Sequence, residues 1–474
     1  MLDLIIMNGT VITMEGKGVG VIENGAVGVK GNRIEAVGPT DEVLRNHKAH
    51  RYIDATRKAV LPGLIDAHMH SPLTAFRGVA QDTNNWLMKG LWPFQEQMDF
   101  DTIMAGSMLC LVEAVSSGTT TFCDYETPMT EIVKNHQKLG SRARVATMIN
   151  ALPPGISTKG VNDLYDLDAS LANEKFKENI ALFEQWHGAE NGRITVMMGP
   201  QAPDMNYKEL LLEARDYAKK VNTKVHMHVS QGDREINQML LRYGKRSIPW
   251  LDEIGYLDDS LIAVHLTEAT REETQLLAKR GAAMVSCTCA IGIIDGIVPP
   301  AADFVEVSDR LALGSDCAVG NNGTNMFNEM KFTAILNKCK YNDPTIFPAW
   351  RVLRMATIDS AKAIGLGDEI GSLKVGKKAD IILVNLDEPC MVPTIQRPIR
   401  NIVPNLVYSA KGGEVDTSII DGKVVMENRR FLTVDRDAVV RAANEATARI
   451  AKKAEATFKT LDTPIARDMR EGYM

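Results

Sequence analysis

The sequence lacks long apolar runs and any cluster of positive charge. No stretch reaches the roughly 18 consecutive apolar residues of a membrane-spanning helix, and the opening MLDLIIMNGTVITMEGKG is too short and too interrupted for a signal peptide. Lys and Arg are scattered and the net charge is −6, which disfavours nucleic acid and anionic membranes as partners. We therefore expect a cytoplasmic protein that acts on a small molecule.

Cysteine and histidine are also scarce. The seven cysteines are an odd number, which favours reduced thiols over a disulfide framework. The pair Cys287 and Cys289 is not accompanied by a second CxxC motif, so a thiolate metal site is not favoured. With 45% apolar and 24% charged residues, the 474-residue chain has the composition of a globular protein with one large and one smaller domain.

The pattern of apolar residues divides the chain into four parts. Residues 1–60 contain short β-type runs broken by Gly and Asn, which predict the first part of a β-sandwich. Residues 61–366 alternate strands with amphipathic helical stretches. Residues 367–430 return to a β pattern and predict the rest of the sandwich. Residues 431–474 contain an Ala/Lys/Glu-rich helix, expected to pack on a surface or on a neighbouring subunit.

The second part predicts the fold class. Its strand candidates are GLIDAHMH, TTTFCD, RVATMINA, ITVMMGP, KVHMHVS, LIAVHL, AAMVSC and RLALGSD. Eight strands with helical crossovers in about 300 residues indicate an α/β protein built on a (β/α)8 TIM barrel. The two β-rich ends of the chain can join into one flanking β-sandwich.

Metal-ligand side chains stand at the ends of four of these strands. They are His68 and His70, His226 and His228, His265, and Asp316. A His-x-His pair on a strand points both rings to the same side, and the carboxyl ends of barrel strands share one rim. Imidazole with one carboxylate suits Zn²⁺ or Fe²⁺. Each histidine alone would more simply be a core residue, but the shared register favours a metal site.

Two further stretches carry a resemblance to a known family. GSDCAVGNNGTNMFNEMK and MATIDSAKAIGLGDEIGSLKVGKKADIILVNLD resemble the amidohydrolase superfamily, in particular its triazine hydrolases and methylthioadenosine/S-adenosylhomocysteine deaminases. The resemblance covers nearly the whole chain. It implies that one divalent metal ion, zinc with iron as the alternative, is bound by His68, His70, His228, His265 and Asp316. His226 would support the site or close a hydrogen bond.

The resemblance also implies a mechanism. Two-metal relatives usually carry a carboxylated lysine on strand four, whereas ITVMMGPQAP has no lysine, so a mononuclear site is expected. The ion would activate water to attack an sp² carbon, with Asp316 taking the proton. Asp316, His265 and Gln231 form the expected catalytic set for hydrolysis of a C–N bond, other than a peptide bond, in a small heterocycle, amide or urea.

The chain departs from its relatives on the substrate side. They usually have His-x-x-Glu at the end of strand five, where this chain has Gln231, and a His where it has Gln201. A glutamine has no titratable proton near neutral pH, so methylthioadenosine and S-adenosylhomocysteine are not favoured as substrates. Asp233, Glu235 or Glu268 could supply the missing acid, although Glu235 and Glu268 fit better as the first residues of surface helices.

Trp86, Gln201, Gln231 and Asn322 are the expected substrate contacts. Trp86 could stack on a flat ring or pack in the core, and Asn322 matches the resembled family's loop beside the metal aspartate. Asp124, at the end of strand two, could orient a ligand histidine or cap the next helix.

Three functions stay open on the sequence alone. The favoured one is C–N hydrolysis; the others are removal of chloride from a triazine, which needs no acid, and a catalytically inactive scaffold. Inactive relatives typically lose metal ligands, and this chain keeps five. We also expect a homodimer or homotetramer, because the resembled family is oligomeric and the long C-terminal helix needs an apolar surface to cover.

Overall fold

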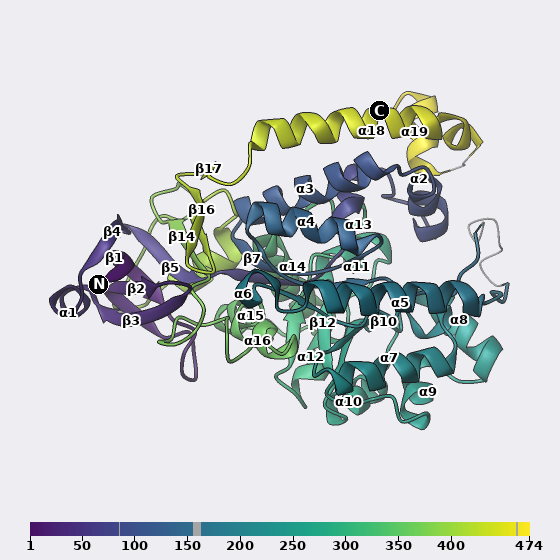
Figure 1. Ribbon diagram of the computed structural model, residues 1–474, viewed down its shortest axis with the longest axis horizontal. Helices are drawn as coiled ribbons and strands as arrows, with labels where there is room; N and C mark the ends of the chain where they lie inside the picture. Colours follow the sequence, from purple (N-terminus) through teal and green to yellow (C-terminus); the bar gives the residue numbers. More distant parts are fainter. Residues whose placement is uncertain (85, 155–162, 461–462) are drawn as a thin grey trace.

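Two four-stranded parallel sheets form the centre of the molecule in the computed structural model, which describes residues 1–84, 86–154, 163–460 and 463–474 (Figure 1). The first sheet contains β6 (Leu64–Met69), β7 (Thr119–Glu126), β8 (Arg142–Thr147) and β9 (Ile194–Val196). The second contains β10 (Val225–Val229), β11 (Leu261–His265), β12 (Ala283–Ser286) and β13 (Leu311–Leu313). All eight predicted strands are therefore present.

The two sheets are joined at both edges by single parallel bridges. Met69 pairs with Asp316 beyond β13, and Met198 beyond β9 pairs with Val225 of β10. These links put the eight strands in sequence order around the centre. All strands run in the same direction, so their carboxyl ends lie on one side.

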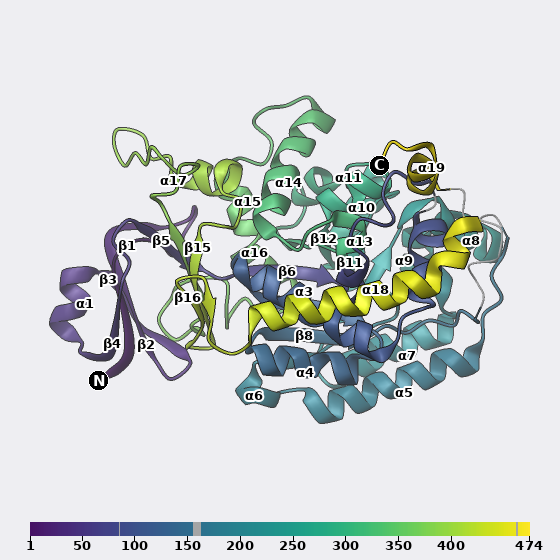
Figure 2. The same cartoon turned by 90° about the horizontal axis from the view of Figure 1, so that it is seen from above.

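Helices cover the outside of these strands (Figures 1 and 2). The long ones are α3 (Phe100–Ser116), α4 (Met129–Leu139), α5 (Ala169–Trp186), α7 (Lys208–Lys220), α8 (Gly232–Tyr243), α10 (Arg271–Lys279) and α14 (Met326–Tyr341). In α4, for example, Met129, Ile132, Val133 and Leu139 are buried, the spacing of a helix with one apolar face. The amphipathic helical stretches predicted between the strands are therefore present, for example as α3, α7 and α10.

Shorter helical turns connect these elements. They are η1 (Ser71–Phe76), η2 (Leu87–Leu91), α2 (Trp92–Gln95), α6 (Ala189–Gly192), η4 (Pro203–Met205), α9 (Ser247–Glu253), α11 (Thr288–Ile294), α12 (Ala301–Val305), α13 (Ala318–Asn321), α15 (Ala349–Met355), α16 (Ile358–Ala363), α17 (Ile402–Pro404) and η5 (Asn405–Ser409). Several of them, namely η1, η2, α2 and η4, lie between strands of the centre and supply walls of the site described below.

Both β-rich ends of the chain meet in one flanking sheet. Its strands are β1 (Leu2–Ile12), β2 (Val21–Lys30), β3 (Arg33–Pro39), β4 (Ala49–Asp54), β5 (Lys58–Pro62), β14 (Ile381–Asn385), β15 (Val415–Ile420), β16 (Lys423–Glu427) and β17 (Arg430–Phe431), with α1 (Thr40–Asn46) between β3 and β4. The predicted joining of the ends is confirmed. The nine strands form one hydrogen-bonded sheet that branches at β1, whose first half pairs with β4 and second half with β5.

The C-terminal helices α18 (Arg436–Thr460) and α19 (Pro464–Glu471) lie on the outside of the molecule, and α18 runs along α3 (Figure 2). Ile450 and Ala454 of α18 are buried, and the Thr447 hydroxyl donates to the Ala75 carbonyl at 3.0 Å. The chain itself therefore covers the apolar face of this helix, which removes the helix as an argument for oligomers. None of the described helices is long and apolar enough to cross a membrane.

Candidate metal centre and active site

Five buried side chains converge where the carboxyl ends of β6, β10, β11 and β13 meet: His68, His70, His228, His265 and Asp316. The Asp316 Oδ1 atom lies 3.6 Å from His68 Nε2 and 3.8 Å from His70 Nε2. Nε2 of His70 lies 3.4 Å from Nε2 of His228. Ligand atoms of His68, His228 and His265 are also within 4.8 Å of one another. The structure thus brings together all five residues predicted to bind metal.

The inner atoms of this cluster lack hydrogen-bond partners. His68 Nε2, both ring nitrogens of His265 and Asp316 Oδ2 are buried without one among the described residues. Unpaired buried polar atoms are costly, and facing lone pairs of neutral imidazoles repel each other. A divalent cation in their midst would satisfy these atoms, so the donor set fits one metal ion.

The outer nitrogens of two of these rings are held by hydrogen bonds. His68 Nδ1 lies 2.8 Å from Nε2 of His226, so the hydrogen bond predicted for His226 is present. His228 Nδ1 donates to the Gln201 carbonyl oxygen at 2.8 Å. In each ring the partner fixes the orientation and leaves Nε2 facing inward, an arrangement typical of metal-binding histidines.

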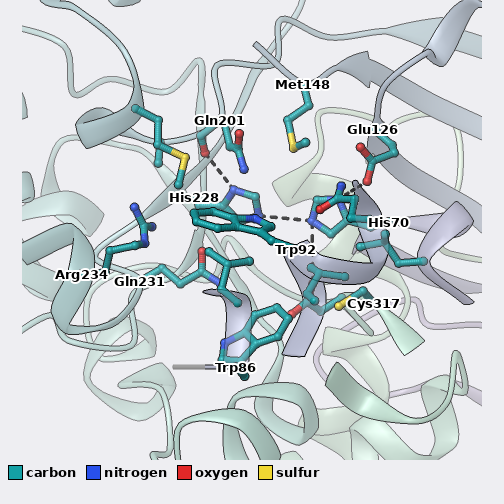
Figure 3. Close-up of a pocket in the computed structure, with 17 residues that line it drawn as sticks. His70, Trp86, Trp92, Glu126, Met148, Gln201, His228, Gln231, Arg234 and Cys317 are labelled. Carbon is teal, nitrogen blue, oxygen red and sulfur yellow. Dashed lines mark hydrogen bonds and ion pairs between the residues drawn. The ribbon is translucent and has the colours of Figure 1, made fainter. Parts of the chain in front are cut away.

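The third ring faces a carboxylate that sequence reasoning missed. Nδ1 of His70 lies 3.6 Å from Oε2 of Glu126, the last residue of β7 (Figure 3). Neither atom has a hydrogen-bond partner among the described residues, and Glu126 is only 4% exposed. The two atoms face each other, so a small approach would pair both and orient His70 as His226 orients His68.

Electrostatics favour neutral imidazoles that can bind a cation. Burial, followed by the charges of neighbouring histidines, lowers the pKa of His68 and of His228 well below the usual value. Burial likewise lowers the pKa of His265 to about 3. His70 differs: burial acts to lower its pKa, but Glu126 and then Asp316 outweigh it, and the pKa is raised. Burial raises the pKa of Asp316 to about 6.

The backbone at these strand ends is strained. Ser230, His265 and Asp316 have φ of 55°, 78° and 61°, in the left-handed region that non-glycine residues rarely occupy and that costs about 1–3 kcal/mol each. Close packing adds a constraint, because a Cβ on Gly314 would lie 3.0 Å from the His68 Cβ and backbone. Surrounding hydrogen bonds must hold this geometry.

A buried network supplies such bonds beneath Asp316. The Asp66 carboxylate accepts from the Ser315 N–H at 2.9 Å and from the Ser315 hydroxyl. The Asn321 amide donates to the Ser315 carbonyl and to Glu329, both at 2.7 Å. The loop that carries Asp316 is thereby fixed on both sides.

Beside the cluster lies a cavity of about 50 Å³, here called the inner cavity (Figure 3). Of the predicted residues it is lined by Trp86, Gln201 and Gln231 together with His70, His228 and Asp316. The structure also places Trp92, Glu126, Met148, Arg234 and Cys317 in its wall. Trp92 lies in the same segment as Trp86, which the sequence singled out. Glu126 lies two residues after Asp124 on β7, so the two side chains share a face of the strand. These two positions are the only hints that the sequence held for Trp92 and Glu126.

The roles predicted for Asn322, Glu235 and Asp124 do not fit this geometry. Asn322 is exposed and lines no part of the cavity; it ends α13 and its carbonyl accepts from Arg77. Glu235 is buried away from the cavity, because its carboxylate accepts from the N–H groups of Ser230 and Gln231 at 2.7 and 2.8 Å. These bonds satisfy free donors at the start of α8, so Glu235 is not a replacement acid.

Asp124 neither contacts a ligand histidine nor caps the helix that follows it. Its carboxylate accepts from the N–H and hydroxyl of Ser71, at 3.1 and 2.5 Å, and lies 3.1 Å from His136 Nε2. Ser71 follows His70 directly, so Asp124 fixes the chain where it leaves β6.

Two predicted acids stand outside the inner cavity. Asp233 lines a second hollow of about 440 Å³, which shares Trp86, Gln231 and Arg234 with the inner cavity. Glu268 is half-buried, and burial and then the charge of Asp233 raise its pKa.

Comparison with known proteins gives consistent matches. The amidohydrolase family model matches residues 59–425. A 5-methylthioadenosine/S-adenosylhomocysteine deaminase from Thermoanaerobacter pseudethanolicus is 34% identical over 93% of this chain and 97% of its own length. Among solved structures, an adenosine deaminase from Xanthomonas campestris with bound zinc is 30% identical, with a TM-score of 0.87 over 95% of this chain and 99% of its own. Atrazine chlorohydrolase from Arthrobacter aurescens in complex with zinc is 22% identical, with a TM-score of 0.82 over 94% and 100% of the two chains, and is similar in fold.

Proposed function

Since the chain belongs to the amidohydrolase family and is a metal-dependent hydrolase of C–N bonds other than peptide bonds, we propose that it removes an amino group from a small heterocycle, amide or urea-type substrate. The eight parallel strands would form one closed (β/α)8 barrel. That closure accounts for ligands from distant parts of the chain meeting at one rim.

We propose that one zinc ion, with iron as the alternative, is held by His68, His70, His228, His265 and Asp316. When bound, such an ion lowers the pKa of water and polarises the atom under attack. The donor set supports a single ion, since its two groups of close ligand atoms, His68 with His228 and His265 and His68 with His70 and Asp316, share His68. The fourth strand, β9, also carries no lysine.

Asp316 is the proposed proton acceptor. Its Oδ2 atom is buried and without a hydrogen-bond partner among the described residues, and burial raises its pKa to about 6. A carboxylate beside the attacking water can take its proton and return it to the departing nitrogen. His265 faces the same point and would hold the reacting groups in position.

Gln231 and Gln201 are proposed to orient the substrate. Both line the inner cavity, and a glutamine amide can donate and accept hydrogen bonds but cannot transfer a proton near neutral pH. The Asn150 amide donates to Gln201 Oε1, which leaves the Gln201 N–H groups for a ligand. These two glutamines, which stand where such deaminases are expected to carry a Glu and a His, support a substrate other than methylthioadenosine or S-adenosylhomocysteine.

The convergence of five metal-ligand side chains beside a cavity carries this proposal. The test is a bound-metal analysis of purified protein, followed by an assay of the metal-loaded enzyme with triazines, pyrimidines, purines and ureas. We expect about one divalent ion per subunit and release of ammonia. A protein that holds no stoichiometric metal and turns over no substrate would instead be an inactive scaffold.

Removal of chloride is the second candidate. A chloride leaving group needs no proton, which suits the absence of a titratable group at Gln231. Reading chloride and ammonia in the same assay separates the two reactions.

A further inference from the structure

One buried carboxylate in the inner cavity is not used by the proposed reaction. Glu126 is 4% exposed and lines the cavity (Figure 3). Its Oε1 accepts from the Thr127 N–H at 3.0 Å, whereas Oε2 faces His70 at 3.6 Å without a hydrogen bond. Burying a carboxylate costs several kcal/mol unless donors or a positive charge compensate it. A carboxylate oxygen has two lone pairs, so Oε2 has room for a donor that a ligand brings even when it also accepts from His70.

Two more carboxylates line the second hollow, here called the acidic hollow. Asp233 and Asp295 line it. Burial, followed by the charges of Glu268, Asp316 and Asp233, raises the pKa of Asp295 to about 6. Glu268 does not line this hollow, but its charge acts to raise the pKa of Asp295, and the charge of Asp233 acts to raise the pKa of Glu268.

Basic residues do not neutralise these groups. Arg234 lines both the inner cavity and the acidic hollow, but it is paired with the buried carboxylate of Asp204. Arg246 donates to the Glu273 carboxylate and the Glu268 carbonyl. Within the described parts of the chain, no ion pair joins Asp233, Glu268 or Asp295 to Lys or Arg.

Lys175 lies on the other side of Glu126. It lines a third hollow of about 660 Å³, to which Glu126 also contributes, and donates to Asn150 at 3.0 Å. The acidic hollow and the inner cavity share Trp86 and Gln231 and do not include Lys175. Their carboxylates are Glu126, Asp233, Asp295 and Asp316, and the one arginine among their described residues, Arg234, is already paired.

We propose that the substrate is a flat cation of the amidinium type, such as a protonated amidine or a ring-protonated amino heterocycle, whose N–H groups bind Glu126 and whose approach is favoured by the acidic hollow. This inference rests on the proposed function. Trp86, shared by the inner cavity and the acidic hollow, and Trp92 offer aromatic surface on which a planar cation can stack. A cleft lined by one sign of charge raises the association rate of the opposite charge about 10- to 1,000-fold.

A cationic substrate also explains why position 231 needs no acid. Water forms a C–O bond to the amidinium carbon and gives one proton to Asp316, which leaves a neutral tetrahedral adduct. Asp316 returns that proton to one amino nitrogen, the C–N bond breaks, and its electron pair leaves with nitrogen. The products are a neutral carboxamide and ammonium, and both water protons end on the ammonium. Charge and atoms balance without proton transfer from Gln231.

Benzamidinium and benzamide form a matched pair of probes, because they share a planar ring and differ in charge. Both are titrated into the metal-loaded enzyme, with tryptophan fluorescence as the readout. We expect benzamidinium to bind at least about tenfold more tightly, with an advantage that shrinks as salt is added. Equal binding, or tighter binding of benzamide, would overturn the inference without any variant.

Two variants locate the effect. Glu126→Gln keeps an oxygen that can accept from His70 but removes the charge, so metal content should stay unchanged while the benzamidinium advantage falls about tenfold. Asp233→Asn with Asp295→Asn should slow benzamidinium association and flatten its salt dependence. The control pair Glu35→Gln with Glu42→Gln, exposed on β3 and α1, changes net charge equally and should have no effect. Unchanged discrimination in both test variants would overturn the inference.

The substrate assay keeps the two proposals separate. If no compound of the panel releases ammonia or chloride, the proposed function fails whatever the probes show. If ammonia is released fastest from neutral or anionic substrates, hydrolysis stands and the cationic substrate class is wrong.

Discussion

The metal side and the substrate side of the site are built differently. On the metal side, each ring that faces inward is buried, and the outer nitrogens of His68 and His228 are held by hydrogen bonds. On the substrate side, Asp233, Asp295 and Gln231 are half-buried or exposed, and Glu126 has an unpaired oxygen. A rigid half can hold an ion in one geometry, whereas a half with spare donors and acceptors can be altered to accept another ligand. Changes on the metal side should therefore abolish function, and changes on the substrate side should shift it.

The largest effect is expected from removing a ligand. His228→Ala or His265→Ala opens the coordination shell, so metal content and turnover should both be lost, as measured by elemental analysis and ammonia release. His50→Ala, at an exposed histidine of β4, is the matched control and should keep both. Full metal content and turnover in either test variant would refute the ligand assignment.

Variants of Glu126 test whether one residue serves both the metal side and the substrate side. If it orients His70, Glu126→Leu should weaken metal binding about 10- to 100-fold, measured by competition with a chelator. Glu126→Gln should bind metal like the unmodified protein, because the amide oxygen still accepts a hydrogen bond. Unchanged affinity in the leucine variant would assign Glu126 to the substrate side alone.

Gln231 belongs to the substrate side, so its effect should be smaller. Gln231→Ala removes a neutral hydrogen bond worth about 0.5–1.5 kcal/mol and should lower kcat/KM by up to about tenfold. Gln231→Glu adds negative charge beside the reacting water and should also slow the native reaction. Asn322→Gly is the control, since Asn322 is exposed with φ of 62°, where glycine fits without strain. If neither Gln231 variant changes the rate, position 231 does not face the substrate.

The smallest effect concerns the network beneath the metal side. Burial raises the pKa of Glu329 to about 8, above its ordinary value of 4.5. Its contribution to stability is therefore complete below pH 4.5 and is lost as the pH rises through 8. Glu329→Gln should flatten the fall in melting temperature between pH 6 and 8.5. Parallel curves for the two proteins would contradict this.

The ligand side could be predicted because its information is local. Each ligand stands at the end of an apolar strand, and His68 and His70 share a side through the period of a strand. Parallel strands then place such ends together. The eight strands and the six candidate side chains therefore follow from the pattern, whereas the choice of five ligands without His226 came from the resemblance to the amidohydrolase superfamily.

The substrate side could not be predicted in the same way. Glu126, Arg234 and Trp92 come from separate segments, and only folding shows that they line one cavity. For Glu235, the sequence suggested a site residue where there is none. Glu235 follows His228 closely in the sequence, but its carboxylate accepts from the free N–H groups at the start of α8 and does not face the cavity. Sequence distance to a ligand therefore does not predict which way a side chain faces.

The branched flanking sheet has a consequence for synthesis of the chain. β5 pairs with β14, and about 320 residues separate Pro62 from its partner Ile381. At about 5–20 residues per second, β5 waits roughly 15–60 s after translation before β14 exists. During that interval the edge of β5 is an unpaired template for other strands. The nascent chain is therefore most exposed to aggregation before its last hundred residues leave the ribosome, and truncation before Ile381 should yield insoluble protein.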